Sequence, residues 1–162
     1  MSELHDEFFS AFDQGNWFLA SQKIVSLADQ SDYGAEILIR LFEGDRFLSN
    51  GKFFPGICRD ERYPRITQQI VDLLCEQLVR DPSVFEKRVF LNVTPTDFSN
   101  PLTVEKTAAL GQKFHQSDRD LVLEFSEIFD GLFFMLSSTA LISSNLSSTG
   151  ISYQPSSGTK LF

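Results

Sequence analysis

The sequence predicts an α/β fold in which helices cover a largely parallel sheet. From residue 33 onward the predicted order is strand, helix, strand, helix, strand, and this alternation is typical of parallel strands joined by covering helices. The apolar runs VFL (89–91) and LVL (121–123) are continuous, as expected for strands that are buried on both faces. The chain has 162 residues, of which 42% are hydrophobic, so it is large enough for one domain with its own core.

The first third of the chain is predicted to form a short helix and two strands. The helix spans 2–13, where apolar residues recur on one side. A strand at 17–27 is interrupted by polar residues at 21–23, and a turn separates it from a second strand at 33–42. The apolar side of the helix consists of Leu4, Phe8, Phe9 and Phe12.

The middle of the chain contains a predicted loop and the strongest helical pattern. Residues 43–64 are rich in Gly, Phe and Pro, which favour a loop. Pro64 lies at the start of an amphipathic helix at about 65–80, because apolar residues recur there every three or four positions. These positions are Ile66, Ile70, Leu73, Leu74 and Leu78.

Two more strands and one helix complete the predicted alternation. Residues 88–93 (RVFLNV) form a strand, and a turn with two prolines leads into a helix at about 102–115. Residues 121–125 (LVLEF) form the last strand. The sequence therefore predicts about four strands with their helices.

The composition changes near residue 130. Between Gly131 and Thr159 there is no charged residue, and serine dominates. We therefore divide the chain into a folded part, 1–128, and a disordered Ser-rich tail, 129–162. Two explanations of the tail stay open: a genuine disordered tail, or a reading frame altered near residue 129.

The net charge argues against several classes of function. At −8, with a pI of about 4.7, the chain has no basic excess for binding a nucleic-acid polymer or an acidic membrane. No run of about 20 apolar residues predicts a membrane span, and the acidic start differs from a signal peptide. Two cysteines without metal spacing favour reduced thiols, so we expect a bacterial-style cytoplasmic protein.

A carboxylate stands in the apolar strand YGAEILIR. Alternate strand residues share a face, so Glu36, Leu38 and Arg40 point the same way. Glu36 and Arg40 are about 13 Å apart along the strand, at about 3.3 Å per residue, which is too far for a direct ion pair. A buried carboxylate requires a partner, a hydrogen bond or a metal. Alone, Glu36 is also explained by an edge position or by a lysine partner.

Two further polar residues end apolar strands. Asn92 ends the strand 88–93, and Glu124 ends the strand 121–125. If these strands are parallel neighbours of the Glu36 strand, all three polar groups reach one edge of the sheet. Their oxygen atoms suit Mg²⁺ or Mn²⁺, and an arginine nearby suits a phosphate. Taken singly, Asn92 is also typical of a turn and Glu124 of a helix N-terminus.

Four stretches together resemble the N-terminal half of an EAL domain, the family of cyclic di-GMP phosphodiesterases. The resemblance covers about residues 5–128, and the stretches occur in the family's order with suitable spacing. GAEILIR resembles the family's signature strand, with Ile37 where the family has alanine. The stretches are WFLASQKIVSL (17–27), YGAEILIRL (33–41), VFLNVTPTDFSNP (89–101) and LVLEFSE (121–127).

The resemblance implies a partial TIM-like barrel of the EAL type and a role for particular residues. The family hydrolyses one phosphodiester bond of cyclic di-GMP with metal-activated water. The implied metal ligands, for Mg²⁺ or Mn²⁺, are Glu36, Asn92 and Glu124. The implied substrate contacts are Gln22, Leu38 and Arg40, and Glu127 matches a glutamate that steadies the loop after the family's fifth strand.

The departures from the family pattern lead us to expect a protein that does not hydrolyse its ligand. The Asp-Asp-Phe-Gly motif that completes the family's two-metal site is absent, and Lys23 replaces a usual proline. We therefore expect an EAL-family protein that at most binds cyclic di-GMP. The alternatives are a non-catalytic module that binds a protein regulator, an active enzyme whose site is completed by a homodimer or another chain, and a non-functional fragment.

Overall fold

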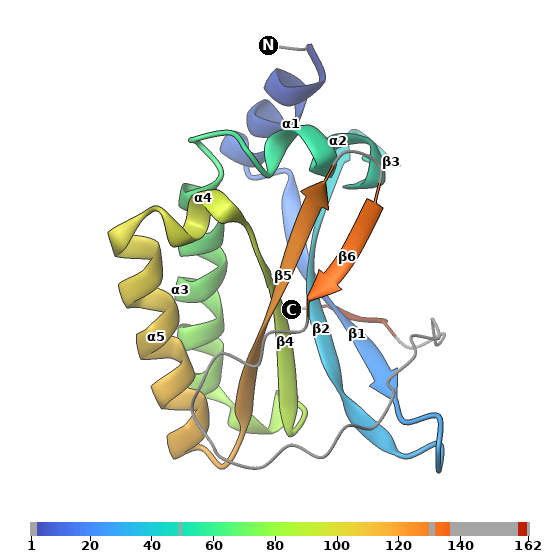
Figure 1. Cartoon of the computed structure of the whole chain (residues 1–162), viewed down its shortest axis with the longest axis vertical. Coiled ribbons are helices and arrows are strands. Elements are labelled where there is room, and N and C mark those ends of the chain that lie inside the picture. Colours follow the sequence, from blue (N-terminus) through green and yellow to red (C-terminus); the bar gives the residue numbers. More distant parts are fainter. Residues whose placement is uncertain (1–2, 49, 130–131, 137–158, 162) are drawn as a thin grey trace.

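The structure is a computed structural model that describes residues 3–48, 50–129, 132–136 and 159–161 (Figure 1). Side chains are described only for part of these ranges, up to residue 125. The helices are α1 (Glu3–Asp13), α2 (Asn50–Ile57), α3 (Pro64–Arg80), α4 (Pro95–Phe98) and α5 (Pro101–Gln116), with a 3-10 turn at Pro82–Val84. The strands are β1 (Trp17–Val25), β2 (Asp32–Glu43), β3 (Arg46–Phe47), β4 (Arg88–Val93), β5 (Asp120–Phe129), β6 (Leu132–Leu136) and β7 (Thr159–Leu161).

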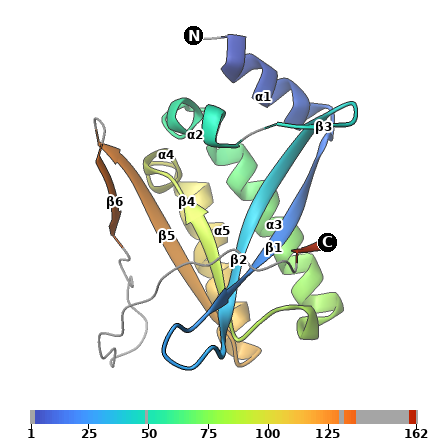
Figure 2. The same ribbon diagram turned by 90° about the vertical axis from the view of Figure 1, so that its right-hand side faces the viewer.

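One mixed sheet runs through the molecule in the order β6-β5-β4-β2-β1-β7. β2, β4 and β5 are parallel, while β1 pairs antiparallel with β2. Helices α3 and α5 lie together on one face of this sheet, as Figures 1 and 2 both show. The predicted α/β fold with parallel strands and covering helices is therefore confirmed.

The core lies between the sheet and these helices. Strand residues alternate between the two faces of the sheet, so one set of apolar side chains meets the helices. This set packs on the inward side of α3 and α5, which places the hydrophobic core on one face and leaves the other face for polar groups. The buried residues of this core include Leu19, Ile37, Leu41, Val89, Leu91, Val93, Leu74, Leu78, Leu110 and Phe114.

The structure corrects two predictions about the first half of the chain. The expected interruption of the first strand at 21–23 is wrong, because β1 is continuous and these residues pair with Ala35–Ile37 of β2. Backbone pairing with β2 keeps this segment in an extended strand, although its side chains are polar. The expected loop at 43–64 contains the short strand β3 and the helix α2. Its Gly and Pro content hid both elements.

The C-terminal residues extend the sheet at both edges. β6 pairs antiparallel with β5, and β7 pairs antiparallel with Ala20–Gln22 of β1. These two segments of the predicted disordered tail are therefore strands. The remainder of the tail, at 130–131, 137–158 and 162, lies outside the described residues.

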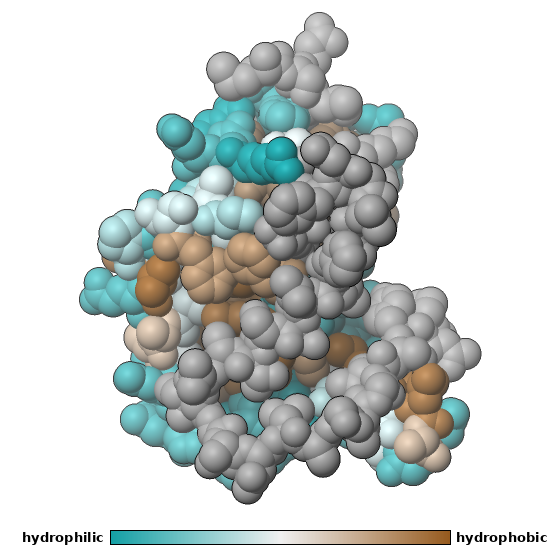
Figure 3. Space-filling view, viewed as in Figure 1, coloured by the Kyte–Doolittle hydropathy of each residue, from teal (hydrophilic) through white to brown (hydrophobic). Residues whose placement is uncertain are grey.

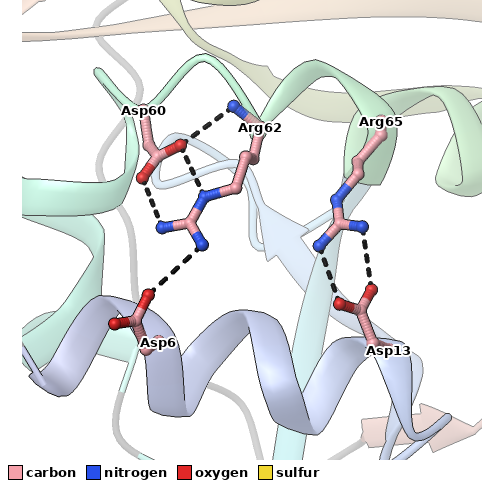
Figure 4. A network of polar contacts seen from close by, with 5 residues as sticks. All are labelled: Asp6, Asp13, Asp60, Arg62 and Arg65. Carbon is pink, nitrogen blue, oxygen red and sulfur yellow. Dashed lines mark hydrogen bonds and ion pairs between the residues drawn. The ribbon is translucent and has the colours of Figure 1, made fainter.

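Helix α1 is held against the rest of the domain by aromatic packing and by two arginines, whose polar contacts are shown in Figure 4. Arg62 donates to both Asp60 and Asp6, and its Cζ lies 4.0 Å from the centre of the Phe9 ring. Arg65 pairs with Asp13 at 2.9 Å. Exposed ion pairs contribute little to stability, so the buried aromatic side chains of α1 provide most of the attachment.

Apolar side chains are exposed where α4 and the start of α5 meet β5. Phe98 is 50% exposed and Leu102 is 49% exposed, and the Phe98 ring lies 5.3 Å from that of Phe125. Figure 3 shows hydrophobic surface in the region of α4, α5 and β5. We call Phe98, Leu102 and Phe125 the α4–β5 patch. Among the described residues, no helix combines the length and the apolar character needed to cross a membrane.

The contact between β2 and β4 makes Gly34 the most constrained glycine of the sheet. A Cβ at Gly34 would lie 2.6 Å from the carbonyl oxygen of Arg88, so Gly34→Ala should push the strands apart and lower the free energy of unfolding by about 1–3 kcal/mol. In α5, a Cβ at Gly111 would come no closer than 4.0 Å to Leu121, so Gly111→Ala should stabilise by about 0.5–1 kcal/mol. Urea unfolding of both variants tests this. Similar stabilities for the two would show that β2 and β4 do not meet this closely.

Candidate metal and ligand site

The register of the sheet places six of the seven predicted site residues on one face. In β1, Gln22 pairs with Glu36 of β2. In β4, Asn92 pairs with Glu124 of β5, two residues beyond the pairing of Glu36 with Phe90. Paired residues point to the same side of a sheet, and residues two apart on a strand share a face. The face that carries the site is therefore the one opposite α3 and α5. It presents Gln22, Glu36, Leu38, Arg40, Asn92 and Glu124.

Glu36 and Asn92 are in direct contact. The Asn92 Nδ2 donates a hydrogen bond of 2.6 Å to the Glu36 Oε1. Partial burial raises the pKa of Glu36, while this bond and the positive charge of Arg40 act in the opposite direction. Lys23, a candidate lysine partner, pairs with Asp32 instead. Glu36 is thus held by Asn92.

Glu124 completes a pair of carboxyl groups with Glu36. Burial, and then repulsion by Glu36, raise the pKa of Glu124 to about 7. Two carboxylates that repel each other in a partly buried position favour a cation between them, because its charge offsets both. The chemistry of this donor set, two carboxylates and an amide, fits a hard cation such as Mg²⁺ or Mn²⁺. The described residues contain no cluster of three or more His, Cys, Asp or Glu suited to a metal.

The sheet opens beside these residues. The pairing of β2 with β4 ends at Ile37 and Leu91, whereas β4 and β5 stay paired to Val93 and Phe125. Figure 2 shows β2 and β4 diverging toward their carboxyl ends. The backbone at Asn92 is therefore paired on the β5 side. The opening lies at the carboxyl edge, where parallel α/β folds place their sites.

The turn after Asn92 is fixed by a buried capping box. The Asp97 carboxylate accepts bonds from the backbone N–H and the hydroxyl of Thr94, at 2.8 and 2.7 Å, and both residues are buried. Thr96 donates to the carbonyl of Cys58. This turn supports the backbone that carries Asn92. Sequence reasoning missed Asp97, although Thr94 and Asp97 are spaced as in a capping box.

The other predicted site residues lie at different distances from the carboxyl pair. Gln22 lies beside Glu36 in the neighbouring strand. Arg40 lies two residues beyond Leu38 on the same face of β2 and pairs with Phe18 of β1. Arg40 Nη1 donates to the carbonyl of Ile39 at 3.4 Å. The backbone of Glu127 pairs with Phe134 in β5 and β6, but its side chain lies outside the described part of the structure.

A sheet whose central strands are parallel, with helices on one face and two glutamates on the other, belongs to the α/β class of which TIM barrels are the closed form. The family model described as EAL domain matches residues 5–150. The chain belongs to the EAL domain family. The match continues past residue 128, where the sequence resemblance described above ends.

Solved structures of EAL proteins share this fold at low sequence identity. The EAL enzyme Bd1971, in a cGMP-bound form, has a TM-score of 0.56 and 20% identity, covering 76% of this chain and 36% of that chain. The PaMucR phosphodiesterase, in complex with c-di-GMP, has a TM-score of 0.57 and 16% identity, covering 75% and 51%. LapD of Vibrio cholerae, bound to c-di-GMP, has a TM-score of 0.54 and 9% identity, covering 75% and 37%.

The chain thus aligns with about a third to a half of the length of these structures. No curated protein sequence matches the chain with significance. The neighbours establish the fold, and the family places the chain among relatives of cyclic di-GMP phosphodiesterases.

The raised pKa of Glu124 predicts a stability that falls as the pH rises. Between its unfolded pKa of about 4.5 and its folded pKa of about 7, the folded chain binds more protons, so the free energy of unfolding decreases over this range. A shift of this size corresponds to about 3 kcal/mol, which partial exposure reduces to about 1–2 kcal/mol. Urea unfolding at several pH values should show a shallower decrease in Glu124→Gln than in the parent chain. Glu105→Gln, on the surface of α5, serves as the control. Identical slopes for the parent and Glu124→Gln would contradict the assignment.

Proposed function

We propose that this chain binds cyclic di-GMP together with one divalent cation and acts in cyclic di-GMP signalling without hydrolysing the ligand. One observation carries the proposal: Glu36, Asn92 and Glu124 converge on the open face that also presents Gln22, Leu38 and Arg40. Family membership supports the choice of ligand, since EAL domains are related to cyclic di-GMP phosphodiesterases. The structure of PaMucR is a complex with c-di-GMP.

Each group of residues has a distinct part in this proposal. Glu36, Asn92 and Glu124 would hold Mg²⁺ or Mn²⁺, in keeping with the general dependence of EAL domains on divalent metals. The cation would draw a phosphate oxygen of the ligand to this edge and offset the charge of the carboxyl pair. Arg40 would donate to the second phosphate of the ligand, farther along β2, through its planar guanidinium group. Gln22 and Leu38 flank the ligand on the same face.

The loss of hydrolysis follows from the number of acidic groups. Two-metal hydrolysis uses cations about 3.5–4 Å apart and a water that is ionised between them. Among the described residues, Glu36 and Glu124 bring two carboxyl groups to this face, and we assign one cation to this pair. A second chain that supplied further carboxylates would restore turnover, and Glu36→Ala would then abolish it.

Thermal unfolding in Mg²⁺, with and without cyclic di-GMP, tests the proposal. At 100 times its dissociation constant the ligand should stabilise the fold by about 2.7 kcal/mol, so the melting temperature should rise. Glu36→Ala should lose this rise, because it removes a cation ligand. Glu105→Ala, with the same change of charge at an exposed position of α5, should keep it. A cooperative melt of the parent chain that does not respond to cyclic di-GMP would overturn the proposal.

The α4–β5 patch supports a second candidate function, a non-catalytic module that binds a protein partner. Exposed apolar patches are typical of interaction surfaces, and Phe98 and Leu102 are each about half exposed. A folded chain that ignores cyclic di-GMP would favour this candidate. The patch belongs to the helix-covered side of the domain, so the two functions do not compete for one surface.

A further inference from the structure

Three phenylalanines form an aromatic surface beside the candidate site. The Phe18 ring in β1 lies 6.5 Å from that of Phe42 in β2 and 5.9 Å from that of Phe47 in β3. Phe47 pairs with Phe42 across the β2–β3 hairpin and is 67% exposed. We call Phe18, Phe42 and Phe47 the aromatic ledge. Its outermost ring is open to solvent, while the two rings behind it are half-buried.

The ledge lies on the same face as the carboxyl pair. Phe18 pairs with Arg40, and Phe42 follows Arg40 by two residues on β2. Phe18, Arg40 and Phe42 therefore point to the same face as Glu36. Along this face β2 presents the carboxylate Glu36, then Leu38, then the cation Arg40, and finally the ledge. At about 3.3 Å per residue, Arg40 lies about 13 Å and Phe42 about 20 Å from Glu36 along the strand.

This series of side chains along β2 is suited to a nucleotide with more than one phosphate. A cation held at Glu36 attracts one phosphate, and Arg40 attracts a second one farther along the strand. An exposed aromatic ring next to a phosphate-binding arginine is suited to the flat face of a base, because bases stack on aromatic side chains whatever their edge chemistry. The α4–β5 patch lacks these properties, since its rings contact the helix-covered side of β5.

We propose that the aromatic ledge is a base-binding subsite, in which Phe47 stacks on one purine base of the ligand while Arg40 holds the adjacent phosphate. This inference rests on the proposed binding of cyclic di-GMP at the same face. It assigns to β3, a two-residue strand in a segment rich in Gly and Pro, the task of positioning Phe47. It also explains why an exposed phenylalanine is backed by two further rings that limit its movement.

Two substitutions at Phe47 test the subsite in the full chain with Mg²⁺. Phe47→Ala should weaken cyclic di-GMP binding by about tenfold, which is within the range measured for base stacking. Its binding of deoxyribose 3′,5′-bisphosphate, a probe with two phosphates and no base, should not change. Phe98→Ala removes a ring of similar exposure from the α4–β5 patch and should leave both affinities unchanged.

A fluorescent variant reports stacking directly. In Phe47→Trp the new indole should be quenched when cyclic di-GMP binds, because a stacked purine lies against it. The native Trp17 stacks on Phe12 at 4.9 Å, on the core side of β1, and should give a constant background. Quenching by the abasic probe as well would argue against a base at this position.

The outcomes separate the subsite from the proposed function. If the parent chain binds cyclic di-GMP and Phe47→Ala binds it equally well, the subsite is wrong and the proposed function stands. If Phe47→Ala lowers the affinity for cyclic di-GMP and for the abasic probe alike, the ring has only a structural role and the subsite is overturned. If the parent chain binds neither probe, the proposed function fails and the subsite fails with it. Melting curves of the variants should match that of the parent, since Phe47 is exposed.

Discussion

The close approach of β2 and β4 is the constraint on which the site depends. Gly34 leaves no room for a side chain between the two strands, and their pairing through Ile37 and Leu91 fixes the register. This register puts Glu36 and Asn92 on the same face and within hydrogen-bond distance. A slip of one residue would turn every side chain of β4 to the other face. Asn92 would then enter the core, and Val93 would enter the site.

The elements that sequence could predict are those with a strong and local pattern. Helix α3 and strand β4 have the predicted bounds to within one residue. Apolar spacing and a flanking proline define α3, and a short apolar run defines β4. The prediction that Glu124 ends its strand is wrong, because β5 continues to Phe129, and Glu36 likewise lies within β2, which continues to Glu43. The predicted meeting of Glu36, Asn92 and Glu124 on one side of the sheet holds, because their strands are parallel neighbours. The hydrogen bond between Glu36 and Asn92 could not be predicted, since it depends on the register.

What sequence could not predict depends on contacts between distant segments. The polar stretch in β1 suggested a break, but pairing with β2 keeps it extended. The β2–β3 hairpin and α2 lie in a stretch whose composition suggests a loop, so the orientation of Phe47 toward Phe18 was not visible. The role of Asp97 could not be predicted for another reason. An aspartate is usually a surface residue, but the turn at Thr94 buries this one.

The burial and mutual repulsion of Glu36 and Glu124 destabilise the free site and favour the binding of a cation. Glu36 and Glu124 sit partly buried and repel each other, and Asn92 donates a hydrogen bond to one oxygen of Glu36. The protein therefore holds Glu124 close to its protonation midpoint at neutral pH, where a proton or a metal ion can neutralise it. In the proposed function, a cation between these two carboxyl groups would hold one phosphate of the diester, and Arg40 would contact the ligand farther along β2. Two-metal cleavage of a phosphodiester uses a second cation and an ionised water, and the described residues bring the two carboxyl groups of Glu36 and Glu124 to this face.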